Sequence, residues 1–336
     1  MFDFVQYLSI GPLIILVVVA LAIILKGADY FVLGASSISI KWGISAFVVG
    51  LTIVAIGTSA PELFINAIAA YSGATDLSIG NILGSNIAGI LLGLGIAAIF
   101  VPLHIKHGTV WKEIPFSLMG AFVVLVFGAD IIINGATENV IVRGEGIALL
   151  TFFVIFISYT FGLSAVEKGD DSDDSENIKE YSWKKSIVYI VLGLIGLIFG
   201  GSLVVESATV LAATAGLSEN LIGLTIVAIG TSLPEIITTI VAARKGQISL
   251  AVGGIVGTII FNIFFALGIT AVIAPLPFNS DNITDALFLM FISILLFIFM
   301  FTGKKHKLER WEGVIFVCLY FSYMAYAIVR DVSTII

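Results

Sequence analysis

Two glutamates occupy the same ten-residue context at two places in the chain. Residues 50–59 recur letter for letter at 223–232, and each copy is followed, one residue later, by a Pro-Glu pair. Glu62 and Glu235 are therefore 173 residues apart in matching positions, inside apolar segments long enough to cross a membrane. A carboxylate at that depth costs about 3 kcal/mol unless it is paired, so the doubled acid indicates a functional site.

The residues around each glutamate offer oxygen atoms that bind hard cations. Proline inside a helix removes a backbone donor and clashes with the carbonyl four residues back, so Pro61 and Pro234 are expected to break their helices and free carbonyls. Free carbonyls at membrane depth are tolerated only where they are buried in protein or line a cavity. With hydroxyls and carboxylates they form an all-oxygen set that suits calcium and sodium, not zinc or copper. The set comprises carbonyls near Ala55 and Ala228, the hydroxyls of Thr58, Ser59, Thr231 and Ser232, and the carboxylates of Glu62 and Glu235.

A glycine-rich segment follows each motif copy and adds further oxygens. Its glycines allow close approach between helix backbones, so Ser85 and Thr258 can present their hydroxyls to the helices that carry the glutamates. Gly89 and Asn262 lie four residues further on, on the same helical face. Asn262 can contribute an amide oxygen, whereas Gly89 has no side chain to contribute.

The composition of the whole chain indicates the elements that position these residues. The chain has 336 residues, of which 59% are hydrophobic and only 12% charged, and its mean hydropathy is +1.13. Soluble domains are less apolar than this. The apolar runs lack the polar alternation of a transmembrane barrel, so they predict a polytopic helical membrane protein. The single cysteine, Cys318, excludes a disulfide within the chain and a cysteine metal cluster, and no basic patch suggests binding to nucleic acid.

The apolar runs and the repeat together predict a fold. The offset of 173 residues also aligns Gly84 with Gly257 and Ser85 with Thr258. Five crossings separate the two copies, so the second copy enters the membrane in the opposite sense, as in the inverted-topology repeats of secondary transporters. We therefore expect an all-α membrane protein with ten transmembrane helices, arranged as two inverted five-helix repeats with broken helices at the midplane. The helices are expected near residues 11–38, 44–71, 77–101, 115–133, 145–165, 185–213, 219–243, 249–273, 283–302 and 311–329.

The distribution of Lys and Arg predicts how the chain is oriented. These residues gather in the connections that follow odd-numbered helices, and such connections face the cytoplasm. Both termini are then extracellular, and the acidic loop 167–184 is cytoplasmic. The loop separates a first repeat, residues 1–166 with the motif at 50–89, from a second repeat, residues 185–336 with the motif at 223–262.

The two motif copies resemble a known family. Gly57-Thr-Ser-Ala-Pro-Glu62 with Gly80-Asn-Ile-Leu-Gly-Ser85, and Gly230-Thr-Ser-Leu-Pro-Glu235 with Gly253-Gly-Ile-Val-Gly-Thr258, are similar to the two α-repeats of the calcium/cation antiporter superfamily, in particular prokaryotic sodium/calcium exchangers. The resemblance covers the whole ten-helix plan. It implies alternating exchange of calcium and sodium at overlapping sites, with the first and sixth helices sliding across the rest of the protein to switch access.

The same resemblance implies a role for each residue of the oxygen set. Glu62 and Glu235 would ligate both ions, and Thr58 and Thr231 would complete the calcium site. The flanking sodium sites would be formed by Ser59, Ser232, Ser85 and Thr258 with the carbonyls of Ala55 and Ala228.

Two positions depart from the family pattern and leave the coupling ion open. Prokaryotic members usually carry Asn in place of Gly89 and Asp in place of Asn262, and animal sodium/calcium exchangers also have Asn at the second position. The two remaining carboxylates balance one calcium ion. Proton coupling, as in the related calcium/proton exchangers, needs only carboxylates that take up a proton when the site is empty.

The predicted function is therefore a secondary-active antiporter, not an enzyme, that exchanges sodium for calcium across a prokaryotic plasma membrane. The alternative on the same fold is a calcium/proton or other cation antiporter. An intramembrane hydrolase using Ser59 or Ser232 would need a His or Lys base at that depth, which the sequence does not offer. A passive channel is disfavoured by broken helices in an inverted repeat. No cofactor is expected, and the predicted partners are calcium, sodium and the lipid bilayer, without an obligate protein partner.

Overall fold

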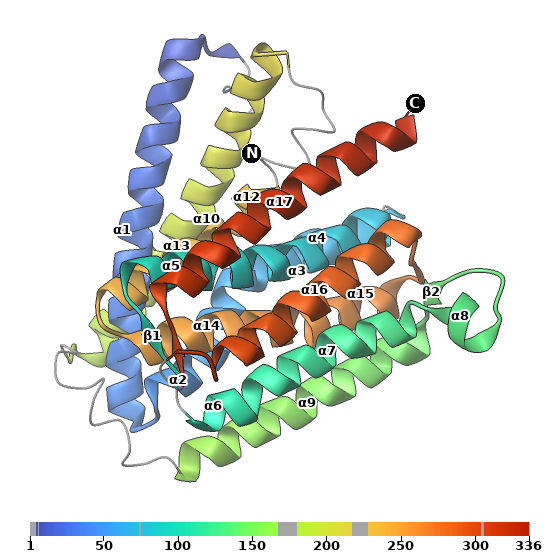
Figure 1. The fold of residues 1–336 in the computed structure, drawn as a ribbon. Helices are drawn as coiled ribbons and strands as arrows, with labels where there is room; N and C mark the ends of the chain where they lie inside the picture. Colours follow the sequence, from blue (N-terminus) through green and yellow to red (C-terminus); the bar gives the residue numbers. More distant parts are fainter. Residues whose placement is uncertain are drawn as a thin grey trace.

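The protein is a bundle of long helices in the computed structural model (Figure 1), which describes residues 5, 7–73, 75–105, 107–166, 180–216, 228–303 and 306–335. Within these residues, nine helical segments are long and apolar enough to cross a membrane, and they coincide with nine of the ten predicted helices. The remaining prediction, 219–243, lies partly outside the described residues, and its described part is helical from Ala228 except at Ser232.

The elements follow one another in the order expected. The first half contains α1 (Ile10–Trp42), α2 (Ala46–Val49), the π-helix η2 (Gly50–Val54), α3 (Ala55–Tyr71), α4 (Thr75–Ala88), the π-helix η3 (Gly89–Leu94), α5 (Gly95–Phe100), α6 (His107–Trp111), α7 (Glu113–Phe127), α8 (Asp130–Asn134) and α9 (Arg143–Val166). The second half contains α10 (Trp183–Thr214), α12 (Ala228–Thr231), α13 (Leu233–Arg244), α14 (Ile248–Ile260), the π-helix η5 (Phe261–Ala266), α15 (Leu267–Ile273), α16 (Ser280–Phe299) and α17 (Arg310–Ile335).

The two halves differ at the prolines that were expected to break helices. In the first half, the prediction is wrong, because α3 continues through Pro61 to Tyr71. Neighbouring helices and local backbone adjustments let membrane helices accommodate proline, and α3 is such a helix. In the second half, the helix is interrupted at Ser232, and Pro234 lies in the first turn of α13, where its missing N–H costs little.

The helices in the middle of the bundle are those that follow the motifs. In the segments Ser78–Phe100 and Ile248–Ile273, 83% of the most apolar window is buried within the protein, against 22% in α1. The glycines of α14 allow the predicted close approach: a Cβ added to Gly253 would lie 2.5 Å from the carbonyl oxygen of Phe47, and one at Gly257 would lie 2.6 Å from that of Leu51. For the equivalent Gly84 of α4, no described atom lies within 4 Å of an added Cβ.

Helices α1 and α10 form a separate pair along one side of the bundle, side by side over their length (Figure 1). Their backbones touch at glycines: a Cβ added to Gly193 would lie 2.6 Å from the backbone nitrogen of Phe31, and one at Gly27 would lie 2.9 Å from that of Leu197. Small residues allow such contacts between membrane helices.

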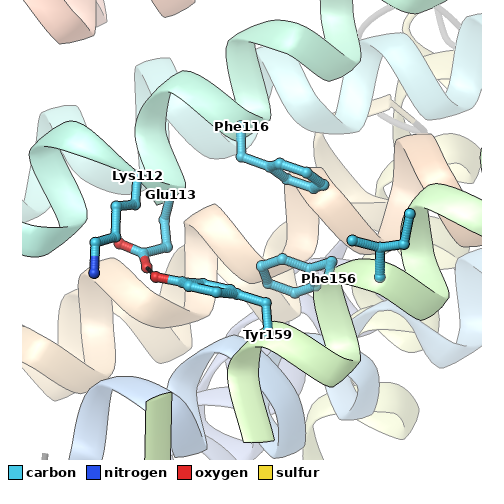
Figure 2. A pocket seen from close by; sticks show the side chains of 6 residues that line it. Lys112, Glu113, Phe116, Phe156 and Tyr159 are labelled. Carbon is cyan, nitrogen blue, oxygen red and sulfur yellow. Dashed lines mark hydrogen bonds between the residues drawn. The ribbon is translucent and has the colours of Figure 1, made fainter. Parts of the chain in front are cut away.

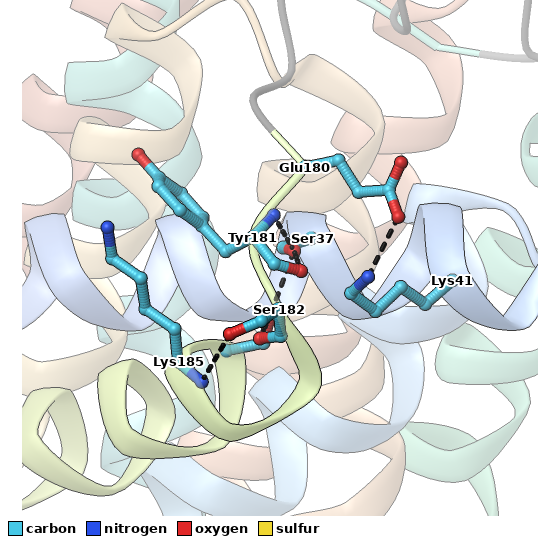
Figure 3. A network of polar contacts seen from close by, with 7 residues as sticks. Ser37, Lys41, Glu180, Tyr181, Ser182 and Lys185 are labelled. Carbon is cyan, nitrogen blue, oxygen red and sulfur yellow. Dashed lines mark hydrogen bonds and ion pairs between the residues drawn. The ribbon is translucent and has the colours of Figure 1, made fainter.

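Polar contacts hold the start of α10 against α1 (Figure 3). Ser182 caps α10 by accepting a hydrogen bond from the backbone N–H of Lys185 at 3.4 Å. The Tyr181 N–H donates to the Ser37 hydroxyl at 2.9 Å, and Lys41 forms an ion pair with Glu180 at 2.7 Å. These contacts fix where the second half of the chain enters the bundle.

Two short β-ribbons join the halves to each other. Strand β1 (Leu103–His104) pairs antiparallel with β4 (Lys307–Leu308), and β2 (Val140–Ile141) pairs antiparallel with β3 (Leu276–Pro277). Figure 1 shows the two ribbons at opposite ends of the bundle.

Two glycine contacts also join the halves, and they lie at equivalent positions. A Cβ added to Gly313 in α17 would lie 2.5 Å from the carbonyl oxygen of Gly95 in α5, and one at Gly146 in α9 would lie 2.9 Å from that of Gly268 in α15. Gly95 and Gly268 are again 173 residues apart. The last long helix of each half therefore packs on the middle of the other half.

Candidate cation-binding site

The two glutamates of the duplicated motif lie in one polar cluster inside the bundle. Glu62 is on α3 and Glu235 is in the first turn of α13. Their side chains are only 2% and 4% exposed, and they are close enough for their negative charges to repel each other. Helices from both halves of the chain thus contribute one carboxylate each to the same place.

Hydroxyl groups surround the carboxylate of Glu235. The Ser59 hydroxyl donates to Glu235 Oε1 at 3.2 Å and lies 3.4 Å from Thr258 Oγ1. The Thr58 side chain is also within hydrogen-bonding reach of Glu235, and its hydroxyl lies 3.0 Å from the carbonyl oxygen of Val54. Residues of α3, α13 and α14 therefore meet around this carboxylate.

An amide and a hydroxyl lie around the carboxylate of Glu62. The Asn262 side chain, from η5, donates through Nδ2 to Glu62 Oε2 at 3.3 Å. Ser85 on α4 is within hydrogen-bonding reach of the same carboxylate, and its single hydroxyl hydrogen is donated in this structure to the carbonyl of Asn81. The position equivalent to Asn262 in the first half is Gly89, the first residue of η3, so the pair of π-helices presents a single amide to the site.

Three oxygen atoms of this cluster lack a hydrogen-bond donor in the described part of the chain: Glu62 Oε1, Glu235 Oε2 and Asn262 Oδ1. All three can only accept, and leaving a buried acceptor unsatisfied costs about 1–3 kcal/mol. A cation supplies the positive charge that such oxygens need. The residues present therefore fit a hard cation bound between the two glutamates.

The remaining members of the predicted oxygen set lie next to this cluster along the chain. Ala55 is buried directly after η2, and its carbonyl oxygen is 3.4 Å from the Thr58 hydroxyl. Ala228 is the first residue of α12, and Thr231 is the last. Ser232 is buried at the interruption before α13, and both Thr231 and Ser232 make polar contacts.

Sequence reasoning missed two asparagines of the cluster. Asn86 is fully buried on α4, and its Oδ1 accepts a hydrogen bond from Asn262 Nδ2 at 3.3 Å. Asn66 lies one turn after Glu62, 1% exposed, and accepts a hydrogen bond from Asn81 Nδ2 at 3.1 Å. The four-residue spacing from Glu62 was a signal for Asn66, because side chains four apart share a helix face. Asn86 gave no such signal, because it follows Ser85 directly in the sequence and adjacent residues lie on different faces of a helix.

A separate cavity of about 260 Å³ lies between α7 and α9 (Figure 2). It is lined mainly by apolar side chains, including Phe116, Ile155 and Phe156, with Glu113 at one end accepting a hydrogen bond from the Tyr159 hydroxyl at 2.5 Å. None of its lining residues belongs to the elements that carry Glu62 and Glu235. The cavity is therefore distinct from the cation-binding cluster.

Comparisons with known proteins agree on one family. The family model described as "Sodium/calcium exchanger protein" matches residues 12–162 and 185–329. The chain is 36% identical over 316 residues to the putative antiporter CaxA of Alkalimonas amylolytica, covering 92% of this chain and 96% of that protein. It is 34% identical over 341 residues to the sodium/calcium exchanger MaX1 of Methanosarcina acetivorans, covering 92% and 97%.

Solved structures give the same result. The sodium/calcium exchanger from Methanococcus jannaschii superposes with a TM-score of 0.79 at 31% sequence identity, covering 94% of this chain and 99% of that chain. This extent of matching includes both motif copies and the helices that position them. The chain therefore belongs to the sodium/calcium exchanger family and is a multi-pass membrane protein of the calcium/cation antiporter superfamily.

Proposed function

We propose that the protein is a secondary-active antiporter that exchanges sodium for calcium across a prokaryotic plasma membrane by alternating access. The observation that carries the proposal is the cluster around Glu62 and Glu235. Two buried carboxylates, one from each copy of the motif, lie together with the Asn262 amide, and each of these three groups has one oxygen without a hydrogen-bond donor among the described residues. Two relatives that match along nearly the whole chain are named as a putative antiporter and a sodium/calcium exchanger.

The chemistry of the cluster fits calcium. Two carboxylates balance the charge of one calcium ion, and calcium takes six to eight oxygen ligands from carboxylates, carbonyls and amides. The proposed ligands are the carboxylates of Glu62 and Glu235, the hydroxyls of Thr58, Thr231, Ser59, Ser232, Ser85 and Thr258, the carbonyls of Ala55 and Ala228, and the amide oxygen of Asn262.

Competition for the same carboxylates explains how the two ion fluxes are coupled. When the site is empty, the two carboxylates repel each other inside the protein. This repulsion disfavours the conformation in which the site is closed to both sides of the membrane. Either calcium or sodium relieves the repulsion, so only the loaded protein can switch the side to which the site opens. Sodium entering from one side thereby displaces calcium to the other.

The packing of α1 and α10 fits their proposed role as the moving pair. They contact each other backbone to backbone through glycines, whereas most of the apolar surface of each faces away from the bundle. On the bundle side, Asp29 of α1 forms an ion pair with Lys245 at 3.0 Å, and the Ser36 hydroxyl bonds the side chain of Gln247. A pair with such close internal contacts is suited to slide as one body.

The inverted repeat remains part of the proposal, with residues 1–166 and 185–336 as its units and 167–184 as a cytoplasmic loop. It is supported by the two β-ribbons and by the equivalent glycine contacts of α5 with α17 and of α15 with α9. Under this arrangement both termini are extracellular, as the distribution of Lys and Arg predicts.

The alternative, proton-coupled calcium exchange, is favoured by one observation. Glu62 and Glu235 are the acids of the cluster, because Gly89 and Asn262 occupy the positions where the family pattern has Asn and Asp. Two carboxylates balance calcium but leave several sodium ions without a matching negative charge. The two coupling modes predict different driving gradients.

The decisive experiment measures calcium uptake into proteoliposomes with gradients of sodium, potassium and protons imposed separately. We expect uptake driven by an outward sodium gradient and abolished when sodium is replaced by choline. Uptake that survives this replacement and follows the proton gradient would establish the alternative. The double variant Glu62→Gln, Glu235→Gln tests the site, and exchange at the wild-type rate in that variant would show that the site assignment is wrong.

A further inference from the structure

We propose that Asn86 is a positioning residue of the cation-binding cluster: it holds the side-chain amide of Asn262 so that the amide oxygen is presented to the transported cation. This inference rests on the proposed function, since it concerns the same site. Asn86 was not among the residues singled out by their position in the motifs.

The hydrogen bonds of Asn262 define the orientation of its amide. The nitrogen Nδ2 carries two hydrogens, and both have an acceptor: Glu62 Oε2 at 3.3 Å and Asn86 Oδ1 at 3.3 Å. The oxygen Oδ1 has no donor within the described residues, although Asn262 is only 1% exposed. Both donor hydrogens of the amide are therefore bonded to protein groups, and its acceptor oxygen is left for a ligand.

Asn86 makes the opposite orientation unfavourable. Turning the Asn262 amide by half a rotation would place Oδ1 against two acceptor oxygens, those of Glu62 and Asn86. Without Asn86, the Glu62 carboxylate alone would face the amide, and a bound cation that draws this carboxylate away would leave the amide free to turn. The Asn86 amide oxygen is uncharged and is a second acceptor for Asn262 that a cation bound to Glu62 would not draw away.

Asn86 makes this contact at a cost to its own hydrogen bonding. Its side chain is fully buried, and its Nδ2 has no acceptor among the residues that the structure describes. A residue serving only helix packing would not need an amide here, and the equivalent position of the second half is Ile259, an apolar residue. The buried amide is therefore explained by its contact with Asn262.

The contact also spans the two halves of the chain. Asn86 belongs to α4 of the first half and Asn262 to η5 of the second. Gly89 offers no side chain, so Asn262 is the amide ligand proposed for the cluster. It is oriented by Asn86, a residue of the opposite half. We thus expect Asn86 to affect cation affinity more than the rate of switching.

The test compares three variants in proteoliposomes by calcium KM and maximal rate. Asn86→Leu keeps the size and removes the acceptor, and we expect it to raise the calcium KM about tenfold while the maximal rate falls less than twofold, since a tenfold change corresponds to the loss of about one hydrogen bond. Asn86→Asp keeps an acceptor toward Asn262 and should not raise the KM. Asn86→Ser, whose hydroxyl is too short to reach, should behave like Asn86→Leu and replaces it if that variant does not fold.

A matched control and a double-variant cycle complete the test. Asn282 on α16 is another buried asparagine with an unpartnered Nδ2 in the described chain, so Asn282→Leu should leave the calcium KM unchanged. In an Asn262→Ala background, Asn86→Leu should have no further effect on KM.

Each result separates the inference from the proposed function. If Glu62→Gln abolishes calcium exchange but Asn86→Leu leaves the KM at the wild-type value, the proposed function stands and this inference is wrong. An Asn86→Asp variant with the same raised KM as Asn86→Leu, or equal effects of Asn86→Leu with and without Asn262, would also overturn it. If the wild-type protein exchanges no calcium under any gradient, the proposed function itself fails.

Discussion

Replacing Asn262 by aspartate should make the folded protein less stable without bound cations, because it adds a third negative charge to the site. The new carboxylate would lie about where the amide is now, 3.3 Å from Glu62 Oε2. Two unit charges at that distance repel by about 5 kcal/mol at an effective dielectric constant of about 20. Glu235 adds a third negative charge nearby.

The consequence is a folded state whose stability depends on sodium. For a chain of this size, 1 kcal/mol corresponds to roughly 2 °C in melting temperature, so sodium-free Asn262→Asp should melt as much as about 10 °C below the wild type where both acids are ionised, and by less where one takes up a proton. Sodium binds only the folded protein and should recover most of this difference, giving the variant a steeper dependence of melting temperature on sodium concentration.

The assay is thermal unfolding of purified protein in detergent, titrated with sodium and separately with calcium, against choline at equal ionic strength. Asn282→Asp is the control, because it buries a carboxylate on α16 outside the cation cluster and should therefore show the same dependence of melting temperature on sodium as the wild type. If Asn262→Asp and the wild type melt at the same temperature without sodium, or if sodium stabilises both equally, the assignment of Asn262 to the site is refuted.

Two further predictions concern the scaffold. Gly257→Ala should cost about 1–3 kcal/mol of stability by overpacking, because its Cβ would lie 2.6 Å from the Leu51 carbonyl oxygen. An unchanged melting temperature in the same assay would contradict this. Arg330→Met should cost about 3–5 kcal/mol, because it leaves Asp285, 7% exposed and bonded to Arg330 at 2.9 Å, as an unpaired buried charge. Adding Asp285→Asn should recover most of that loss, and a double variant no more stable than Arg330→Met would contradict the explanation.

Much of the fold follows from patterns that the sequence displays directly. Long apolar runs can be satisfied in lipid only as helices, and nine of the ten predicted spans are present in the described residues. The family and the meeting of Glu62 with Glu235 were likewise indicated by the repeated motif, because two copies with an odd number of crossings between them face each other inside the protein.

Other features depend on packing that no local pattern encodes. The continuation of α3 through Pro61 is one such feature, because a membrane helix can pass through a proline where the surrounding structure accommodates the carbonyl that it frees. The role of Asn86 depends on an amide contact with a residue 176 positions away, set by how α4 meets η5. The repeat indicates that the two segments meet, but it does not show this contact, because the position equivalent to Asn86 is Ile259 and the one equivalent to Asn262 is Gly89.

Helices α9 and α17 each pack on the half of the chain to which they do not belong, and this arrangement affects how the protein folds during synthesis. Gly146 of α9 packs on Gly268, and Gly95 of α5 packs on Gly313, so each half is completed by a helix from the other. The first half inserted during synthesis therefore leaves unfilled helix-packing surfaces until α15 and α17 emerge from the ribosome. Neither half is expected to be stable when expressed alone, whereas the two expressed together as separate fragments should assemble, because the interlocked helices join them without a covalent link.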